Sequence, residues 1–197
     1  MPSKSKNKGN TLEREMRDVL NATYETEEFA RTPSSGAIMG LSNYKKNQGL
    51  SASTRTILGS DLICPDWFKF SVECKWYADK PNYAQIIKGA DTDLDGWLAE
   101  ACFDARNLEL NPLLFFKTNR KGVHAALPAF FWPRLQMTCH LRYYEFLIIG
   151  IDDFVNNAEV IKDEGETSIR QTLEWLDRSE WVNQAICTMQ TKKGKKR

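Results

Sequence analysis

The segment that decides the fold is Phe68-Lys69-Phe70-Ser71-Val72-Glu73-Cys74-Lys75-Trp76. Every second residue from Phe68 to Trp76 is apolar or small, and every residue between them is polar. A period of two indicates a β-strand with one buried face and one solvent-exposed face. Glu73 and Lys75 therefore point the same way, about 7 Å apart along the strand. The sequence predicts a strand over residues 68–77 that carries an acid and a lysine on its polar face.

A second acid, Asp61, stands twelve residues before Glu73, in the segment Gly59-Ser60-Asp61. Hydrolysis of a phosphodiester needs an activated water and relief of charge on the phosphate, and a bound Mg²⁺ supplies both. Because Mg²⁺ takes oxygen ligands and keeps several waters, Asp61, Glu73 and the nearby backbone carbonyl of Cys74 are suitable ligands. Lys75 can orient the attacking water or stabilise the transition state electrostatically. The layout predicts a metal-dependent phosphodiesterase site, with Mn²⁺ expected to substitute for Mg²⁺.

Each of these residues also has a simpler interpretation. An acid-x-lysine pair on a polar strand face can be an exposed charge pair that contributes little stability. Asp61 can be an ordinary turn acid. A further acid, Glu13, is a candidate for the same site, but it can also be the third-position partner of a helix capping box that begins at Asn10. The residues alone leave these alternatives open.

Basic residues gather at both ends of the chain. Removing the three lysines within 1–9 and the five basic residues within 191–197 from a net charge of +1 leaves −7 for the rest. Basic tails on an acidic body are typical of flexible arms that contact the phosphate backbone of a nucleic acid. Such tails can also serve only to keep the protein soluble. We expect residues 1–9 to be a disordered basic arm, 10–190 a single domain, and 191–197 a basic tail.

The bulk composition excludes several classes of protein. The five cysteines are scattered and form no CxxC pair, which indicates reduced thiols and neither a disulfide framework nor a zinc site. No apolar run approaches the roughly 18 residues of a membrane span, and the first residues have no apolar core typical of a secretory signal. We expect a cytoplasmic protein that has no membrane partner.

The remaining patterns predict a mixed α/β sheet flanked by helices. Apolar residues at helical spacing predict helices over 11–24, 83–107 and 167–189. Runs of β-prone residues predict a short strand at 62–64, a hairpin of 113–117 with 123–131 around the turn 119–122, and a central strand over 143–151. Residues 37–58 lack clear periodicity and are predicted to form a long loop, which in a compact domain is usually functional or disordered.

Four segments together resemble the PD-(D/E)xK nuclease superfamily, and most closely the archaeal-type Holliday junction resolvases. They are Gly9-Asn10-Thr11-Leu12-Glu13-Arg14-Glu15-Met16, Arg31-Thr32-Pro33-Ser34-Ser35-Gly36, Asp61, and Val72-Glu73-Cys74-Lys75. That family opens with a helix carrying Glu-Arg-Glu, continues with an Arg and a Ser/Gly turn, and places Asp and then Glu-x-Lys on adjacent strands. The likeness covers about residues 9–77 well and 83–131 loosely.

The resemblance implies a restriction-endonuclease-like core in which Glu13, Asp61 and Glu73 bind the metal and Lys75 is catalytic. It places Arg14, Arg31 and Ser35 near the scissile phosphate or the DNA backbone, although Arg31 and Ser35 can also simply build a turn. The basic residues of the long loop, which can equally be a solvated surface, are further candidates for DNA contact. They are Lys45, Lys46 and Arg55.

Two departures from the compact archaeal enzymes leave the substrate open. The segment between Gly36 and Asp61 is longer than in those enzymes, and about 60 C-terminal residues, 132–190, are an elaboration. Such versions resemble phage-encoded resolvases or recombination and repair nucleases, which would act in the host cytoplasm.

We expect a Mg²⁺-dependent endonuclease that cuts branched DNA such as a four-way junction. Because resolvases cut two opposed strands, we also expect a two-fold homodimer, with an interface from residues 143–151 or from the last helix. A sequence-specific restriction-type enzyme with base readers in the major groove is the first alternative. A non-catalytic DNA-binding protein of the same fold is the second, and a globular protein unrelated to DNA is the third.

Overall fold

The computed structural model describes residues 4–33, 59–88 and 92–194. Within these ranges the strands form a five-stranded sheet in the order β3-β4-β5-β7-β6, and a two-stranded sheet of β1 and β2. The bounds of the strands are β1 Ala30–Arg31, β2 Leu62–Ile63, β3 Phe70–Tyr77, β4 Asn111–Thr118, β5 Val123–Pro128, β6 His140–Tyr143 and β7 Phe146–Gly150.

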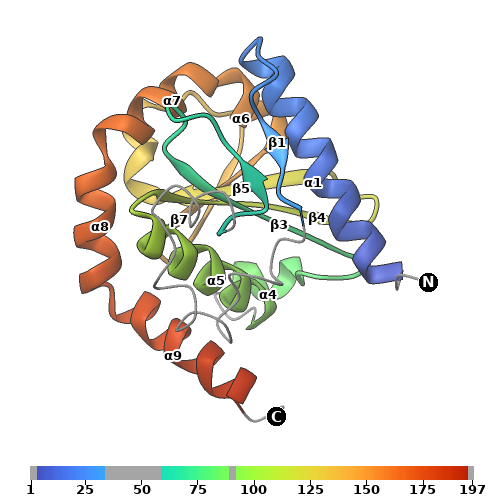
Figure 1. Ribbon diagram of the computed structural model, residues 1–197. Helices are drawn as coiled ribbons and strands as arrows, with labels where there is room; N and C mark the ends of the chain where they lie inside the picture. Colours follow the sequence, from blue (N-terminus) through green and yellow to red (C-terminus); the bar gives the residue numbers. More distant parts are fainter. Residues whose placement is uncertain (1–3, 34–58, 89–91, 195–197) are drawn as a thin grey trace.

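The large sheet lies between two layers of helices (Figure 1). One layer packs its buried apolar side chains on the face that holds Val72 and Cys74 of β3. It contains α1 Lys4–Thr23, α6 Ile151–Asn156 and α7 Ala158–Thr167, together with the short 3₁₀ helix η1 Ala129–Arg134. The other layer contains α4 Tyr83–Ile87, α5 Thr92–Leu108, α8 Ile169–Arg178 and α9 Glu180–Gly194.

The sheet is mixed, as the sequence predicts. Strand β3 pairs in parallel with β4, so that Glu73 lies opposite Leu114 and Lys75 opposite Phe116, and α5 forms the crossover between the two strands. The other neighbouring strands are antiparallel. The short strand at 62–64 and the hairpin of β4 with β5 are confirmed, although β5 ends at Pro128 and the chain then enters η1.

The prediction that β3 exposes one face to solvent is wrong. Ser71 and Glu73, on the predicted polar face, are as buried as the apolar residues between them. Helix α5 causes this burial, because it packs on that face of β3 and β4. The polar side chains of β3 therefore lie in an interior between sheet and helix, where a charge needs a partner.

Helix α1 begins earlier than the sequence predicts. It starts at Lys4, so residues 4–9 are helical instead of a disordered arm, and Asn10 lies inside the helix instead of capping it. The buried stripe of Leu12, Met16 and Leu20 anchors the helix on the sheet. Once those turns are formed, adding residues at the N-terminal end costs little because helix growth needs no new nucleus.

Two of the predicted helices are each divided in the structure. The segment 83–107 forms α4 and α5, with 89–91 between them outside the described residues. The segment 167–189 forms α8 and α9, which are separated by Ser179 in an extended conformation. The Ser179 hydroxyl oxygen accepts from the backbone N–H of Val182 at 3.2 Å and so caps α9. The helices α6 and α7 were not predicted.

The predicted strand at 143–151 is β7, shortened by a turn before Phe146 and by the start of α6 at Ile151. It lies between β5 and β6 in the sheet, and its residues from Phe146 to Ile149 are at most 5 % exposed. The suggestion that this run forms a dimer interface is therefore wrong, because the sheet and both helical layers already cover it.

Helix α7 approaches β3 closely at Gly165. A β-carbon built on Gly165 would lie 2.4 Å from the ring of Phe70, which is buried. The amide of Asn111, at the start of β4, donates to the carbonyl of Gly165 at 2.7 Å and to that of Lys69 at 2.8 Å. These contacts fix the start of β3 against its neighbours and so set the position of the site residues further along the strand.

Candidate active site

Strand β3 lies at the edge of the large sheet, and the segment Ser60–Asp61 binds to its free side. The Ser60 hydroxyl donates to the carbonyl of Val72 at 2.8 Å and accepts from its N–H at 2.9 Å. The N–H of Asp61 donates to the same carbonyl at 2.9 Å, and Asp61 Oδ2 accepts from the N–H of Cys74 at 2.8 Å. Side-chain and backbone groups thus satisfy the edge of β3 and hold the Asp61 carboxylate beside it.

The carbonyl of Cys74 lies on the same edge. In a strand the N–H and C=O groups of one residue point to the same side, and alternate residues share that side. Because the N–H groups of Val72 and Cys74 both face the Ser60–Asp61 segment, the Cys74 carbonyl also faces away from β4. The strand geometry therefore puts this oxygen on the edge that Asp61 covers, and its part in binding a cation stays a prediction.

Glu73 and Lys75 lie under α5 and form an ion pair with each other. On its other side, Lys75 Nζ is 2.9 Å from Oε2 of Glu100, a residue of α5. The side chain of Lys75 is only 18 % exposed and that of Glu73 only 10 %. The alternative that Glu73 and Lys75 are an exposed charge pair is therefore wrong, since burial makes their charges depend on these specific partners.

Glu13 reaches the site from α1, on the opposite face of the sheet from Glu73. It is buried, and its Oε2 accepts from Nη1 of Arg31 at 3.0 Å. Because α1 begins at Lys4, Glu13 stands well inside the helix and the capping-box interpretation is wrong. Burial raises the pKa of Glu13, and the negative charge of Asp61 adds to this effect against the opposing Arg31.

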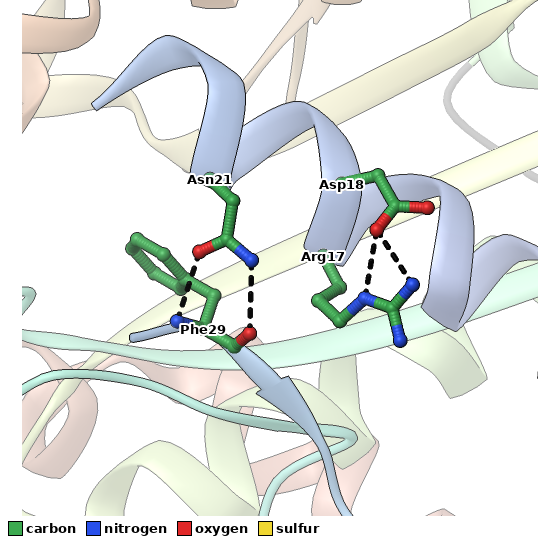
Figure 2. Close-up of polar contacts among 4 residues, drawn as sticks. All are labelled: Arg17, Asp18, Asn21 and Phe29. Atoms are coloured by element: carbon green, nitrogen blue, oxygen red, sulfur yellow. Dashed lines mark hydrogen bonds and ion pairs between the residues drawn. The ribbon is translucent and has the colours of Figure 1, made fainter. Parts of the chain in front are cut away.

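Two backbone connections hold Arg31 in this position. The Asn21 amide, on α1, accepts from the N–H of Phe29 at 3.0 Å and donates to its carbonyl at 3.1 Å, as Figure 2 shows. Strand β1 then pairs with β2, with Arg31 opposite Leu62, and the N–H of Thr32 donates to the carbonyl of Asp61 at 3.0 Å. The helix, β1 and the Asp61 segment are thereby tied to one another.

The electrostatics of the cluster follow from an excess of acids in a buried setting. Burial raises the pKa of Glu73 well above its ordinary range, and nearby Asp61 adds to the rise, whereas Lys75 opposes it. Burial alone would lower the pKa of Lys75, but the surrounding carboxylates of Glu73 and Glu100 outweigh it and raise that pKa. Clustered carboxylates that repel one another are stabilised by a cation, and here the cations of the protein are Arg31 and Lys75.

The donor set suits a hard divalent cation, because it consists of three carboxylates and a backbone carbonyl. In the described parts of the chain, however, no three His, Cys, Asp or Glu side chains are close enough together to hold a metal ion. Glu13 and Glu73 are bound by Arg31 and Lys75. Their oxygens would have to exchange these partners for the metal, which the excess of negative charge favours.

The sequence does not predict that Glu100 and Asp104 of α5 belong to the site. Glu100 contacts Lys75, and the charges of both acids raise the pKa of Glu73. Their spacing of four residues on a predicted helix places them on one helical face. Nothing in the sequence shows that this face meets β3, because that depends on how the crossover packs.

The candidate DNA-binding residues are only partly described. Arg14 is exposed on α1 next to Glu13, and Arg31 contacts Glu13. Ser35, Lys45, Lys46 and Arg55 lie outside the described residues. The structure therefore pairs Glu13 with Arg31 and Glu73 with Lys75, and the charge of Asp61 acts on both glutamates, with Arg14 next to Glu13 on α1.

A family model with the description "Phage putative PDDEXK endonuclease" matches residues 4–173. The chain belongs to this family. The PDDEXK match confirms the predicted superfamily, and the mixed sheet flanked by helices is consistent with its fold. It also extends beyond residue 131, where the resemblance in the sequence ends, through α6 and α7 and into α8.

The PDDEXK family is one of nucleases, which agrees with the expected class of activity and with DNA as the kind of partner. No curated protein and no solved structure matches the chain. Among the helices of the described residues, none is both long and apolar enough to span a membrane.

Proposed function

We propose that this chain is a divalent-metal-dependent DNA endonuclease that is specific for branched DNA, as the Holliday junction resolvases are. The observation that carries the proposal is that Asp61 is held at the free edge of β3, where its charge acts on Glu13 and Glu73, with Lys75 paired to Glu73. Membership of the PDDEXK family supports the chemistry. The choice of a branched substrate rests on the resemblance of the sequence motifs.

In this proposal Glu13, Asp61, Glu73 and the carbonyl of Cys74 hold the cation, with Mg²⁺ preferred and Mn²⁺ able to replace it. When bound, the cation supplies Lewis acidity and a reactive water. Asp61 is held by the N–H of Cys74, so one of its oxygens is fixed while its charge acts on both Glu13 and Glu73. Fixed charges of this kind need no reorganisation when the phosphate reacts.

Lys75 places a positive charge in a largely dry setting, where its effect on a developing negative charge is larger than in water. We assign it to the phosphate that is cut. Arg31 and Arg14 lie on the side of Glu13, and we assign both to the DNA backbone, together with Ser35, Lys45, Lys46 and Arg55. In this role Arg31 would leave Glu13 to a metal and contact a phosphate instead.

A cleavage assay tests the proposal. Purified protein is incubated with a four-way junction, a three-way flap and a linear duplex of matching sequence, each with Mg²⁺, Mn²⁺ or a chelator. We expect cleavage of the branched DNA that needs the cation. Equal cleavage of the linear duplex would contradict the specificity for structure. Cleavage of the duplex at one sequence would instead favour the restriction-type alternative, and binding without cleavage would favour the non-catalytic one.

We also propose that two chains act together, since a junction has two strands to cut. Sedimentation velocity of the protein with and without junction DNA tests this. A single monomeric species under both conditions would contradict it.

A further inference from the structure

Lys75 has two carboxylate partners, and they come from different elements. Glu73 is on the same strand, whereas Glu100 is on α5, with its Oε2 2.9 Å from Lys75 Nζ. The neighbours of Glu100 in the helix, Ala99 and Ala101, are almost completely buried against the sheet. The backbone that carries Glu100 is therefore fixed relative to β3.

The two partners differ in their surroundings. The side chain of Glu73 is 10 % exposed and that of Glu100 is 29 % exposed. If Glu73 binds a cation, Lys75 loses the carboxylate to which it is paired, and a buried ammonium group without a counter-charge is costly. Glu100 is already in contact and can supply that counter-charge without movement of the strand.

We propose that Glu100 is a positioning residue for Lys75. It holds the ammonium group in place while Glu73 serves the cation. This inference rests on the proposed function, because it assumes that Glu73 and Lys75 act in cleavage. It goes beyond that function, because Glu100 would contact neither the cation nor the DNA and would act only through Lys75.

The test compares Glu100→Gln with Asp93→Asn. Asp93 is also on α5 and also pairs with a lysine, Lys80, at 2.9 Å, but that pair is exposed and lies outside the cluster. We expect E100Q to lower kcat on junction DNA by roughly ten- to a hundredfold, as a misplaced catalytic group does. The KM and the affinity for DNA without metal should stay unchanged, and D93N should behave as the wild type.

Two further variants separate positioning from folding. Glu100→Ala removes the carboxylate without leaving an amide in the cluster, and Ala favours the helix, so it serves if E100Q does not fold. Glu100→Asp keeps the charge on a shorter side chain and should restore part of kcat. If Glu100 had a purely structural role, its substitutions would instead lower the melting temperature, and each of them would change KM and kcat together.

A second readout does not depend on cleavage. In metal-free protein, brief acetylation followed by mass spectrometry measures how fast Lys75 reacts. We expect Lys75 to react several times faster in E100Q than in the wild type or D93N, because one of its two partners is gone. A wild-type protein that cuts no DNA would refute the proposed function, and the acetylation rates would still test the contact. An active wild type with unchanged kcat and acetylation in E100Q would overturn the inference.

Discussion

The carboxylate of Asp61 accepts a 2.8 Å hydrogen bond from the backbone N–H of Cys74, the residue between Glu73 and Lys75. Asp61 therefore has two effects. One of its oxygens satisfies an N–H group at the strand edge, and its negative charge contributes to the electrostatics of the cluster. Structure and charge can be separated at this position, because an amide oxygen accepts the same hydrogen bond without the charge.

Asp61→Asn and Asp61→Ala form the matched pair for this separation. We expect both to abolish cleavage, while DNA binding persists. Only the Ala variant also leaves the Cys74 N–H without its partner, which should lower the free energy of unfolding by about 1–3 kcal/mol. Urea denaturation and a cleavage assay measure the two effects. Full cleavage by Asp61→Asn would refute the role of Asp61 in metal binding.

The raised pKa of Glu73 predicts how the metal-free protein responds to pH. A carboxyl group whose pKa is higher in the folded state stabilises that state at low pH, and this stability is lost as pH rises through the folded pKa. We therefore expect the free energy of unfolding to fall as pH rises above the ordinary value of 4.5. The fall should be smaller in Glu73→Gln, where this group cannot ionise.

The same pKa shift predicts the pH at which cleavage activity declines on acidification, which is the acid limb of the pH–activity profile. The carboxylates must be ionised to bind a cation, and burial raises the pKa of both Glu73 and Glu13. Cleavage should therefore decline, on acidification, at a higher pH than ordinary carboxyl groups would give. A higher concentration of Mg²⁺ should move this limb to lower pH, because the metal competes with the proton. A limb that does not respond to Mg²⁺ would contradict this explanation.

Asn21→Ala should detach β1 from α1. Both hydrogen bonds to the backbone of Phe29 are lost, so we expect a loss of about 1–2 kcal/mol and a weaker hold on Arg31. The control is Asp18→Asn, which removes the exposed ion pair of Asp18 with Arg17 on the same helix (Figure 2). Such a pair contributes little, and the control should stay within about 0.5 kcal/mol of the wild type. Equal losses in both variants would contradict the anchoring role.

Gly165→Ala tests the close approach of α7 to β3. The added methyl group would meet the Phe70 ring, and overpacking of this kind costs about 1–3 kcal/mol. Gly150→Ala is the control, since its β-carbon would meet nothing within 4 Å. Combining Gly165→Ala with Phe70→Leu should recover part of the loss in a double-mutant cycle. Additive losses would show that the two residues do not interact.

The sequence predicts much of the site because the family's motif is local. Glu73 and Lys75 share a face through the period of two, and Asp61 lies next to them on the neighbouring segment. The partners from distant elements are not predicted. Glu100 reaches Lys75 only because the crossover helix lies on that face of the sheet, and no local pattern encodes that packing.

The errors in the fold have similar causes. Burial of the polar face of β3 follows from tertiary packing, which a single strand cannot reveal. The division of the last helix was visible in principle, because Ser179 followed by Glu180 is typical of a helix start. The continuous apolar spacing on both sides of Ser179 hid that signal. The predicted helix starts later than α1 does, because the first residues of α1 are polar and carry no apolar stripe.

The position of β3 at the sheet edge has a consequence for the behaviour of the protein in concentrated solution. A strand edge with open N–H and C=O groups is a template on which another chain can add a strand, and this leads to aggregation. Here Ser60 and Asp61 cover that edge with their own hydrogen bonds. Asp61, which is proposed to hold the cation, therefore also helps to keep a second chain from adding a strand at the β3 edge.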